Sequence, residues 1–284
     1  MRKLILFSIY LCLLVTSLSQ EEIREEPSEN NGNTIVEGHR GGMGISPQNT
    51  LKAFSKCIEL GCDSSELDIW LTKDKQIVVV HGGSHGELEH YTQNCTGRVP
   101  DKYYWEIQYC NVGEGERIPL LLEVFQLCRD KMWINIEIKS NNRPEILDLL
   151  WEMIVEQHFV EQCGVSSFNF GMMEDFYILS QGRIKRGYIY GSSVKKYDIE
   201  YVATHGTSAN IGFSYLTKEL CDAIHAEGHE VMTWANVSPE ESHYQNLIDM
   251  GADILCVNYP DKLIEYLKIT NQKPEDYTLL RKRD

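Results

Sequence analysis

The stretch Trp133-Ile134-Asn135-Ile136-Glu137-Ile138-Lys139 decides how this chain is expected to fold. Its β-branched, apolar residues predict a buried strand, and an amphipathic helical pattern follows at 144–159. The same order of strand and helix recurs along the chain. The other predicted strands cover 34–39, 64–70, 164–168, 184–190, 208–213, 230–236 and 253–258, and the other helical patterns lie near 48–61, 119–130, 172–181, 195–203, 216–227, 239–250 and 260–270.

This alternation predicts an α/β fold with a parallel sheet, because a helix connects each strand to the next. Eight such units close naturally into a (β/α)8 TIM-type barrel, and 34–270 has the length of one barrel domain. A doubly wound open sheet is the alternative fold. No Gly-x-Gly-x-x-Gly turn supports that alternative.

The strand-like run 76–81 does not fit the alternation, since only about five residues separate it from the strand 64–70. A parallel neighbour would need a crossover of roughly a dozen residues or more. We therefore predict an antiparallel hairpin that turns at 72–76 and returns His81 opposite residues 66–67. The segment 82–117, rich in Gly, Tyr and charge, becomes a small insertion in the second βα loop, where such segments shape active sites.

The N-terminal residues predict a targeting segment. A basic start at 1–3, an apolar run at 4–15 and small residues at 17–19 are typical of a secretory signal peptide over 1–19. An uncleaved anchor helix is the alternative, although the run is short for a membrane span. We expect an acidic, disordered lead-in at 20–33, the barrel at 34–270 and a tail at 271–284. The mature protein is expected to be secreted or lumenal, without a membrane span.

The net charge of −15 argues against nucleic acid and anionic membranes as partners. An anionic small-molecule substrate would therefore have to be attracted by a local metal ion and basic residues. A secreted chain also permits disulfides, whose connectivity the sequence leaves open. Cys95 and Cys110 bracket a polar segment and are the pair we expect, whereas Cys128, Cys221 and Cys256 lie in apolar contexts that predict buried thiols. The oligomeric state is not indicated by the sequence.

Three carboxylates fall at the ends of predicted strands. Glu66 and Asp68 point to one face of their strand, as do Glu137 and Lys139 of theirs, because strand side chains alternate. At the mouth of a barrel the carboxylates would repel one another unless a cation binds them. Ligation by oxygen alone suits Mg²⁺ or Ca²⁺ rather than zinc. The alternative is a solvated acidic surface, but Glu137 lies between apolar residues, and a buried charge needs a partner.

The first strand ends in His39, which Arg40 and two glycines follow directly. The glycines allow a tight turn and close approach of an anion, and the arginine guanidinium matches the geometry of a phosphate. His81 supplies a second imidazole at a strand end. Two histidines, one acting as base and one as acid, suit phosphodiester cleavage near neutral pH. A structural role is the alternative for either histidine on its own.

These motifs together resemble the glycerophosphodiester phosphodiesterase family over about residues 34–265. The resemblance is carried by motifs in the family's order: His39-Arg40-Gly41, Pro47-Gln48-Asn49-Thr50, Glu66-Leu67-Asp68, Val79-Val80-His81, Glu137-Ile138-Lys139, Trp234 and Tyr259-Pro260-Asp261. It implies a (β/α)8 barrel with a small insertion. Three departures stand out: Gln48 replaces the family's usual Glu, Gly82 replaces an Asp beside the second histidine, and Asn258 stands where an Asp is common.

The resemblance also implies roles for single residues. Glu66, Asp68 and Glu137 match the ligands of one divalent cation, Mg²⁺ or Ca²⁺. The two catalytic histidines are matched by His39 and His81. The phosphate-neutralising cations are matched by Arg40 and Lys139, and Trp234 matches an aromatic residue that lines the substrate pocket, with ordinary barrel packing as its alternative.

The function implied is a secreted, metal-dependent phosphodiesterase that hydrolyses glycerophosphodiesters to glycerol 3-phosphate and an alcohol. The first alternative is a phospholipase D-like enzyme acting on lysophospholipids or sphingomyelin, with a cyclic phosphate as one route. An apolar rim on the insertion would favour it, and the insertion holds Tyr91, Tyr103, Tyr104, Trp105 and Tyr109. The second alternative is a non-catalytic binding barrel, which the retention of every ligand and both histidines disfavours.

Overall fold

A computed structural model describes residues 34–191, 196–234 and 239–270 of the chain. The predicted signal peptide at 1–19, the lead-in at 20–33 and the tail at 271–284 lie outside the described residues. Residues 235–236 of the predicted strand 230–236 and residue 195 of a predicted helix lie outside them as well. No helix in the described part of the chain has the length and apolar character needed to cross a bilayer.

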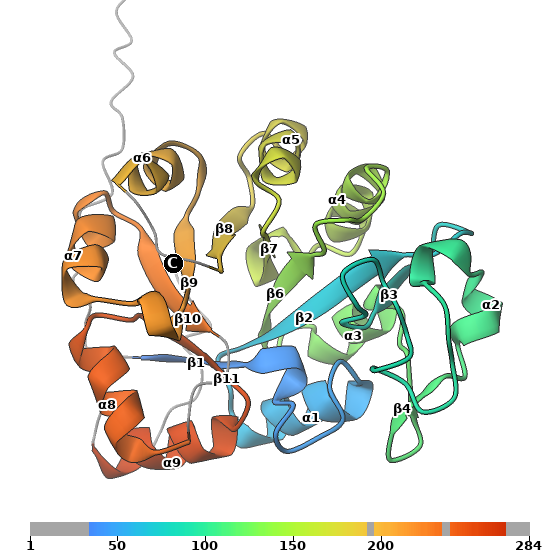
Figure 1. Cartoon of the computed structure of the whole chain (residues 1–284), viewed down its shortest axis with the longest axis horizontal. Coiled ribbons are helices and arrows are strands. Elements are labelled where there is room, and N and C mark those ends of the chain that lie inside the picture. The colour runs from blue at the N-terminus through green and yellow to red at the C-terminus, as the bar shows by residue number, and fades with distance from the viewer. Residues whose placement is uncertain (1–33, 192–195, 235–238, 271–284) are drawn as a thin grey trace, which may run out of the picture.

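Eight parallel strands form a closed barrel, as the alternation predicted (Figure 1). Each strand pairs with the next barrel strand along the chain, and the first pairs with the second and the last, so the ring has no open edge. The alternative of an open sheet is therefore wrong. The strands are β1 (Ile35–Gly38), β2 (Ser64–Leu71), β6 (Trp133–Ile138), β7 (Cys163–Ser167), β8 (Lys185–Tyr190), β9 (Ser208–Gly212), β10 (Glu230–Trp234) and β11 (Ile254–Val257).

Helices surround the ring of strands on its outside (Figure 1). Each predicted helical pattern in the described residues corresponds to one of them: α1 (Leu51–Leu60), α3 (Leu121–Cys128), α4 (Ile146–Glu156), α5 (Phe170–Ser180), α6 (Lys196–His205), α7 (Lys218–Ala226), α8 (Glu241–Asp249) and α9 (Pro260–Ile269). Short 3₁₀ helices are η1 (His39–Gly41), η3 (Val160–Gln162) and η4 (Phe213–Tyr215). The apolar sides of the helices pack on the strands and form one large core.

The predicted hairpin is present as β3 (Ile77–Val79), which pairs antiparallel with β2. Ile69 faces Val79, so the same register places His81 opposite Leu67, as predicted. The backbone N–H of Val80 also donates to the Asp68 carbonyl at 3.0 Å. The hairpin thus brings a residue from beyond the barrel wall back beside the carboxylates.

The insertion at 82–117 shares a small core with the hairpin and contains a disulfide. It contains η2 (Val99–Asp101), α2 (Tyr104–Ile107), β4 (Asn111–Gly113) and β5 (Glu116–Arg117). Its core is made of Trp70, Val78, Val80, Leu88, Val99, Ile107, Cys110 and Ile118. The expected Cys95–Cys110 disulfide closes the segment, and the expected burial of Cys128, Cys221 and Cys256 is confirmed. The insertion is therefore held against the hairpin by packing, and the disulfide links two parts of the insertion itself.

Candidate active site

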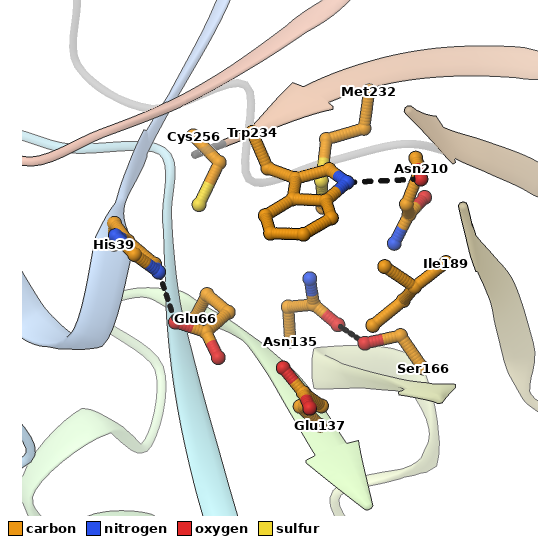
Figure 2. Close-up of a pocket in the computed structure, with 10 residues that line it drawn as sticks. All are labelled: His39, Glu66, Asn135, Glu137, Ser166, Ile189, Asn210, Met232, Trp234 and Cys256. Carbon is orange, nitrogen blue, oxygen red and sulfur yellow. Dashed lines mark hydrogen bonds and ion pairs between the residues drawn. The ribbon is translucent and has the colours of Figure 1, made fainter. Parts of the chain in front are cut away.

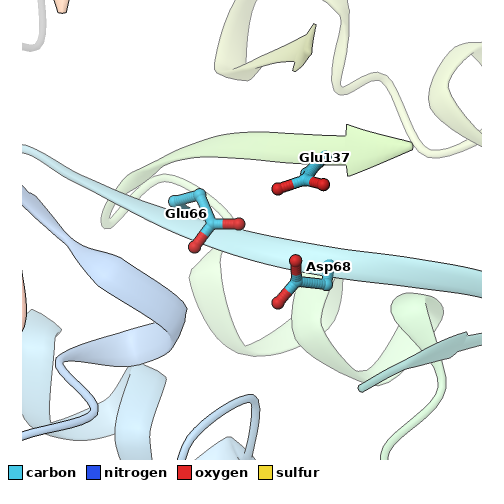
Figure 3. A group of neighbouring side chains, drawn as sticks. All are labelled: Glu66, Asp68 and Glu137. Carbon is cyan, nitrogen blue, oxygen red and sulfur yellow. The ribbon is translucent and has the colours of Figure 1, made fainter. Parts of the chain in front are cut away.

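The three predicted carboxylates meet at one end of the barrel, where β2 and β6 lie side by side (Figure 3). The parallel register pairs Asp68 with Glu137, and Glu66 lies on the same face of β2 as Asp68. One oxygen from each carboxylate lies within 4.8 Å of the others. Glu66 is 6% exposed and Asp68 is fully buried, so the alternative of a solvated acidic surface is wrong.

Two cationic side chains lie against this acidic cluster. Lys139 Nζ lies 2.8 Å from Glu137 Oε1 and 3.2 Å from Asp68 Oδ1. Arg40 Nε lies 3.5 Å from Asp68 Oδ2, and the Arg40 backbone N–H donates to Glu66 Oε2 at 2.9 Å. Because three carboxylates face two cations, one net negative charge is left in a buried place.

The pKa values reflect this imbalance. Burial, followed by repulsion from Asp68 and Glu137, raises the pKa of Glu66 well above its ordinary value. Burial also raises the pKa of Glu137. Burial would raise the pKa of Asp68 as well, but the charges of Lys139 and Arg40 lower it below the ordinary range. Protonation is therefore favoured at Glu66 and Glu137 over Asp68.

The residues present fit a hard divalent cation. Glu66 Oε1 is buried and has no hydrogen-bond partner, although a buried carboxylate oxygen normally has one. The ligand atoms offered are all carboxylate oxygens, which suit Mg²⁺ or Ca²⁺. A divalent ion here would remove the repulsion that raises the Glu66 pKa.

His39 begins η1 directly after β1 and is oriented by a residue that sequence reasoning left without a role. Its Nδ1 lies 2.6 Å from Asn258 Oδ1, just after β11. Because an amide oxygen only accepts, Nδ1 carries the proton and Nε2 is left bare. That Nε2 lies 4.0 Å from Glu66 Oε2. Burial, followed by the charge of Arg40, lowers the His39 pKa to about 4, so the ring is neutral near pH 7.

His81 is oriented in the same way by the backbone. Its Nδ1 donates to the Gly82 carbonyl at 2.6 Å, and its ring packs on Tyr91 of the insertion at 4.9 Å between centroids. The His81 carbonyl accepts from Trp70 Nε1 at 2.9 Å. Burial lowers the His81 pKa to about 4. The acceptor for Nδ1 of this histidine is therefore a backbone carbonyl.

The other departure, Gln48, keeps a structural role. Its Oε1 accepts from Arg40 Nη1 at 2.9 Å, so an uncharged acceptor holds the guanidinium. The neighbouring Asn49 donates to Asp68 Oδ2 at 2.8 Å and accepts from the Asp68 backbone N–H at 3.2 Å. Sequence reasoning assigned no role to Asn49 or Asn258. The only sequence feature that pointed to a role was position: Asn49 lies within the motif at 47–50, and Asn258 directly precedes the motif at 259–261.

A small pocket opens beside the acidic cluster (Figure 2). The indole of Trp234 lies across it from Glu137, donates to the Asn210 carbonyl at 3.1 Å and meets Phe168 edge to face at 5.4 Å. The residues that line it are His39, Glu66, Asn135, Glu137, Ser166, Ile189, Asn210, Met232, Trp234 and Cys256. Trp234 therefore lines this pocket and also packs on Phe168. The pocket has a charged wall and an apolar wall.

Comparison with known proteins identifies phosphodiesterases and a lysophospholipase D as relatives of the chain. Residues 39–262 match the model of the Glycerophosphoryl diester phosphodiesterase family. A Glycerophosphodiester phosphodiesterase of Caldanaerobacter subterraneus is 32% identical over 245 residues, which cover 83% of this chain and 98% of that protein. Lysophospholipase D GDPD1 of Homo sapiens is 28% identical, covering 81% of this chain and 84% of that protein.

A solved structure agrees in fold. The Oleispira antarctica phosphodiesterase OLEI02445, determined in complex with the product sn-glycerol-3-phosphate, superposes with a TM-score of 0.72 at 23% identity. The match covers 83% of this chain and 97% of that one. At this identity the likeness concerns the fold, and it extends over the whole barrel.

Proposed function

The chain belongs to the glycerophosphoryl diester phosphodiesterase family, and from that premise we propose that it hydrolyses glycerophosphodiesters to glycerol 3-phosphate and an alcohol. The observation that carries the proposal is the meeting of three carboxylates, two cations and two neutral imidazoles beside one pocket. The relatives named for this activity and the Oleispira enzyme with its product support it.

Charge balance supports dependence on a divalent cation. With all three carboxylates ionised, the cluster and its two cations leave one net negative charge, which would repel an anionic substrate. Glu66, Asp68 and Glu137 would hold Mg²⁺ or Ca²⁺, and the bound ion would supply electrostatic stabilisation to the phosphoryl oxygens. With one divalent ion the site carries one positive charge, which matches the single negative charge of a phosphodiester.

The side chains of the chain itself have separate tasks. Arg40 and Lys139 would neutralise the phosphoryl oxygens as negative charge builds up in the transition state. The bare Nε2 of His39 accepts a proton from the attacking hydroxyl. His81, after protonation beside the anionic substrate, returns a proton to the leaving alkoxide. A phosphorus–oxygen bond to the nucleophile forms and the bond to the alcohol breaks.

The nucleophile is either water or the 2-hydroxyl of the substrate glycerol. In the second case a cyclic phosphate forms first, and the two histidines exchange roles when water opens it. Both routes use the same two imidazoles.

A substrate panel tests the proposal. Glycerophosphocholine and related diesters are incubated with the protein, with and without a chelator, and glycerol 3-phosphate is measured. We expect release that the chelator abolishes and that added Mg²⁺ or Ca²⁺ restores. Near wild-type turnover by His81→Ala or Glu137→Ala would contradict the assigned roles. Cation binding without any hydrolysis would favour the non-catalytic barrel.

A phospholipase D-like activity on lysophospholipids or sphingomyelin is the second candidate. The observation that favours it is exposed aromatic surface on the insertion, at Tyr103, Trp105 and Tyr109. The relative named Lysophospholipase D supports it as well. Release of choline from lysolipid at a rate far above that from glycerophosphocholine would select this candidate.

We also propose that the protein is secreted or lumenal. The N-terminal pattern at 1–19 and the Cys95–Cys110 disulfide both support an oxidising compartment. Expression in a secreting host, with sequencing of the mature N-terminus, tests this. We expect export and cleavage near residue 19, and retention of the intact chain inside the cell would contradict it.

A further inference from the structure

Three aromatic side chains are displayed in solvent on the insertion. Tyr103, Trp105 and Tyr109 are 40%, 66% and 77% exposed. Tyr103 and Trp105 stack with ring centroids 6.3 Å apart, and Tyr109 lies in the turn that directly follows α2. An exposed cluster of large aromatic residues on a rigid element usually marks an interaction surface.

We define Tyr103, Trp105 and Tyr109 as the aromatic patch. The segment that carries it is packed on a buried core. The insertion core and the Cys95–Cys110 disulfide lie beneath it. Ile107 of α2 is buried in that core and Tyr103, Trp105 and Tyr109 are not. Exposure of these rings is therefore a property of a packed structure, and it is not explained by a loose loop.

The patch lies at the same end of the barrel as the active site. The Lys73 N–H donates to the Lys102 carbonyl at 2.7 Å, and the Tyr104 N–H donates to Asp74 Oδ1 at 2.9 Å. These bonds connect the segment that carries the patch to the tip of the β2–β3 hairpin. The hairpin continues from the end of β2 that carries Asp68, and its tip at Thr72 is four extended residues, about 13 Å, from Asp68. In Figure 1, α2 lies at the outer edge of the molecule beyond β3.

The charges around the patch are balanced, which suits a zwitterionic surface. Lys73, Lys75 and Lys102 stand against Asp74, Asp101 and Glu106, although the whole chain has a net charge of −15. Lys73 Nζ lies 4.8 Å from the Tyr103 ring centroid. Tyrosine and tryptophan rings favour the headgroup level of a lipid surface, and their faces attract quaternary ammonium groups.

We propose that the aromatic patch docks the protein on the surface of a phosphocholine-lipid bilayer. The inference rests on the proposed function and deepens it, because it gives lipid aggregates as a source of substrate for the same site. Trp105 and Tyr109 enter the headgroup layer, and the lysines at the hairpin tip meet the lipid phosphates. The acidic remainder of the protein gives no general attraction to anionic membranes.

Binding to large unilamellar phosphatidylcholine vesicles tests the inference, with the bound fraction measured by co-sedimentation. We expect wild type to bind and Trp105→Ala and Tyr109→Ala each to lower the partition coefficient about tenfold, the effect of losing one buried aromatic ring. The matched control is Ile178→Ala, because Ile178 is 68% exposed on α5, outside the insertion. It should bind as wild type does, and thermal unfolding of each variant checks that it folds.

Four outcomes would overturn the inference: no binding by wild type, unchanged binding by both patch variants, an equal loss in the control, or a dimer that Trp105→Ala converts to a monomer. The last would assign the patch to a second copy of the chain. Turnover of soluble glycerophosphocholine is measured separately. Turnover by wild type without vesicle binding by wild type refutes only the docking surface, whereas vesicle binding without turnover refutes the proposed function.

Discussion

The amide oxygen of Asn258 lies 2.6 Å from Nδ1 of His39, across the seam where the last barrel strand meets the first. This contact fixes both the plane of the imidazole and the nitrogen that carries its proton. It leaves Nε2 directed at Glu66, where a base is needed. Partners that orient histidines in metal sites typically change activity or metal affinity by about 10- to 100-fold when they are removed, and we expect the same scale for Asn258.

Replacement of Asn258 should therefore lower kcat with little change in KM. We expect Asn258→Ala to lose about 10- to 100-fold in kcat, because His39 loses its preferred tautomer and orientation. Asn258→Asp keeps the acceptor and should retain most of kcat, while its charge moves the acidic limb of the pH–rate profile upward. Equal losses in the two variants, or an unchanged profile for Asn258→Asp, would show that the contact is only structural.

Gly82 is expected to be needed for its backbone conformation. Its φ is +61°, and a Cβ there would lie 2.9 Å from both Gly86 Cα and Trp70 Nε1. Gly82→Ala should lower kcat, because the carbonyl that holds His81 must move. It should also destabilise the fold by more than the roughly 1–2 kcal/mol of a left-handed backbone alone. Denaturant unfolding and steady-state kinetics measure the two effects.

Gly115→Ala is the matched control for that change. Gly115 also has a positive φ, +80°, but nothing lies within 4 Å of a Cβ built there. The control should lose only the free energy of unfolding that a left-handed backbone costs, and its kinetics should be normal. Similar kinetics in the two alanine variants would argue against a role for the Gly82 carbonyl.

Cation affinity should rise with pH. Burial and the neighbouring carboxylates raise the pKa of Glu66, and burial raises that of Glu137, so protons compete with the cation above the ordinary carboxyl range. As pH falls, protonation displaces the ion, and affinity drops by up to about tenfold per pH unit for each proton displaced. Calorimetric titration with Mg²⁺ or Ca²⁺ in buffers of different ionisation enthalpy measures both affinity and proton release.

Glu66→Gln provides the comparison, because the amide cannot take up that proton. The variant should bind the cation weakly and with a smaller dependence on pH. Affinity for the wild type that stays constant between about pH 5 and 8 would contradict the raised pKa of Glu66.

The Cys95–Cys110 disulfide should stabilise the insertion and, through Tyr91, the position of His81. It closes a loop of 15 residues, for which chain entropy predicts about 3 kcal/mol of stabilisation. The double variant Cys95→Ser/Cys110→Ser should unfold at lower denaturant concentration and lose kcat. Reductant should lower the stability of wild type in the same way and leave the variant unaffected. Equal stability of both proteins would rule out this contribution.

The sequence was sufficient for the barrel and for most of the site. Strand and helix periodicity are local properties, so the alternation along the chain predicted every barrel strand. The spacing of Glu66 and Asp68 placed them on one face of their strand, and the position of Glu137 near the end of its own strand predicted that it would face the same mouth of the barrel. The short link before 76–81 required the hairpin that returns His81. The disulfide was also expected, because its two cysteines flank one irregular segment.

The partners of the two histidines could be known only from the tertiary structure. Asn258 is separated from His39 by 219 residues and meets it because the barrel closes. The Gly82 carbonyl and the Tyr91 ring hold His81. One contact depends on a backbone turn and the other on packing, and neither can be predicted from the residue types. Sequence pattern determines where a side chain leaves its own strand. Which donor or acceptor that side chain meets depends on how distant segments pack. This packing determined the tautomers and the lowered pKa values of the two histidines, and it left the rings of the aromatic patch exposed to solvent.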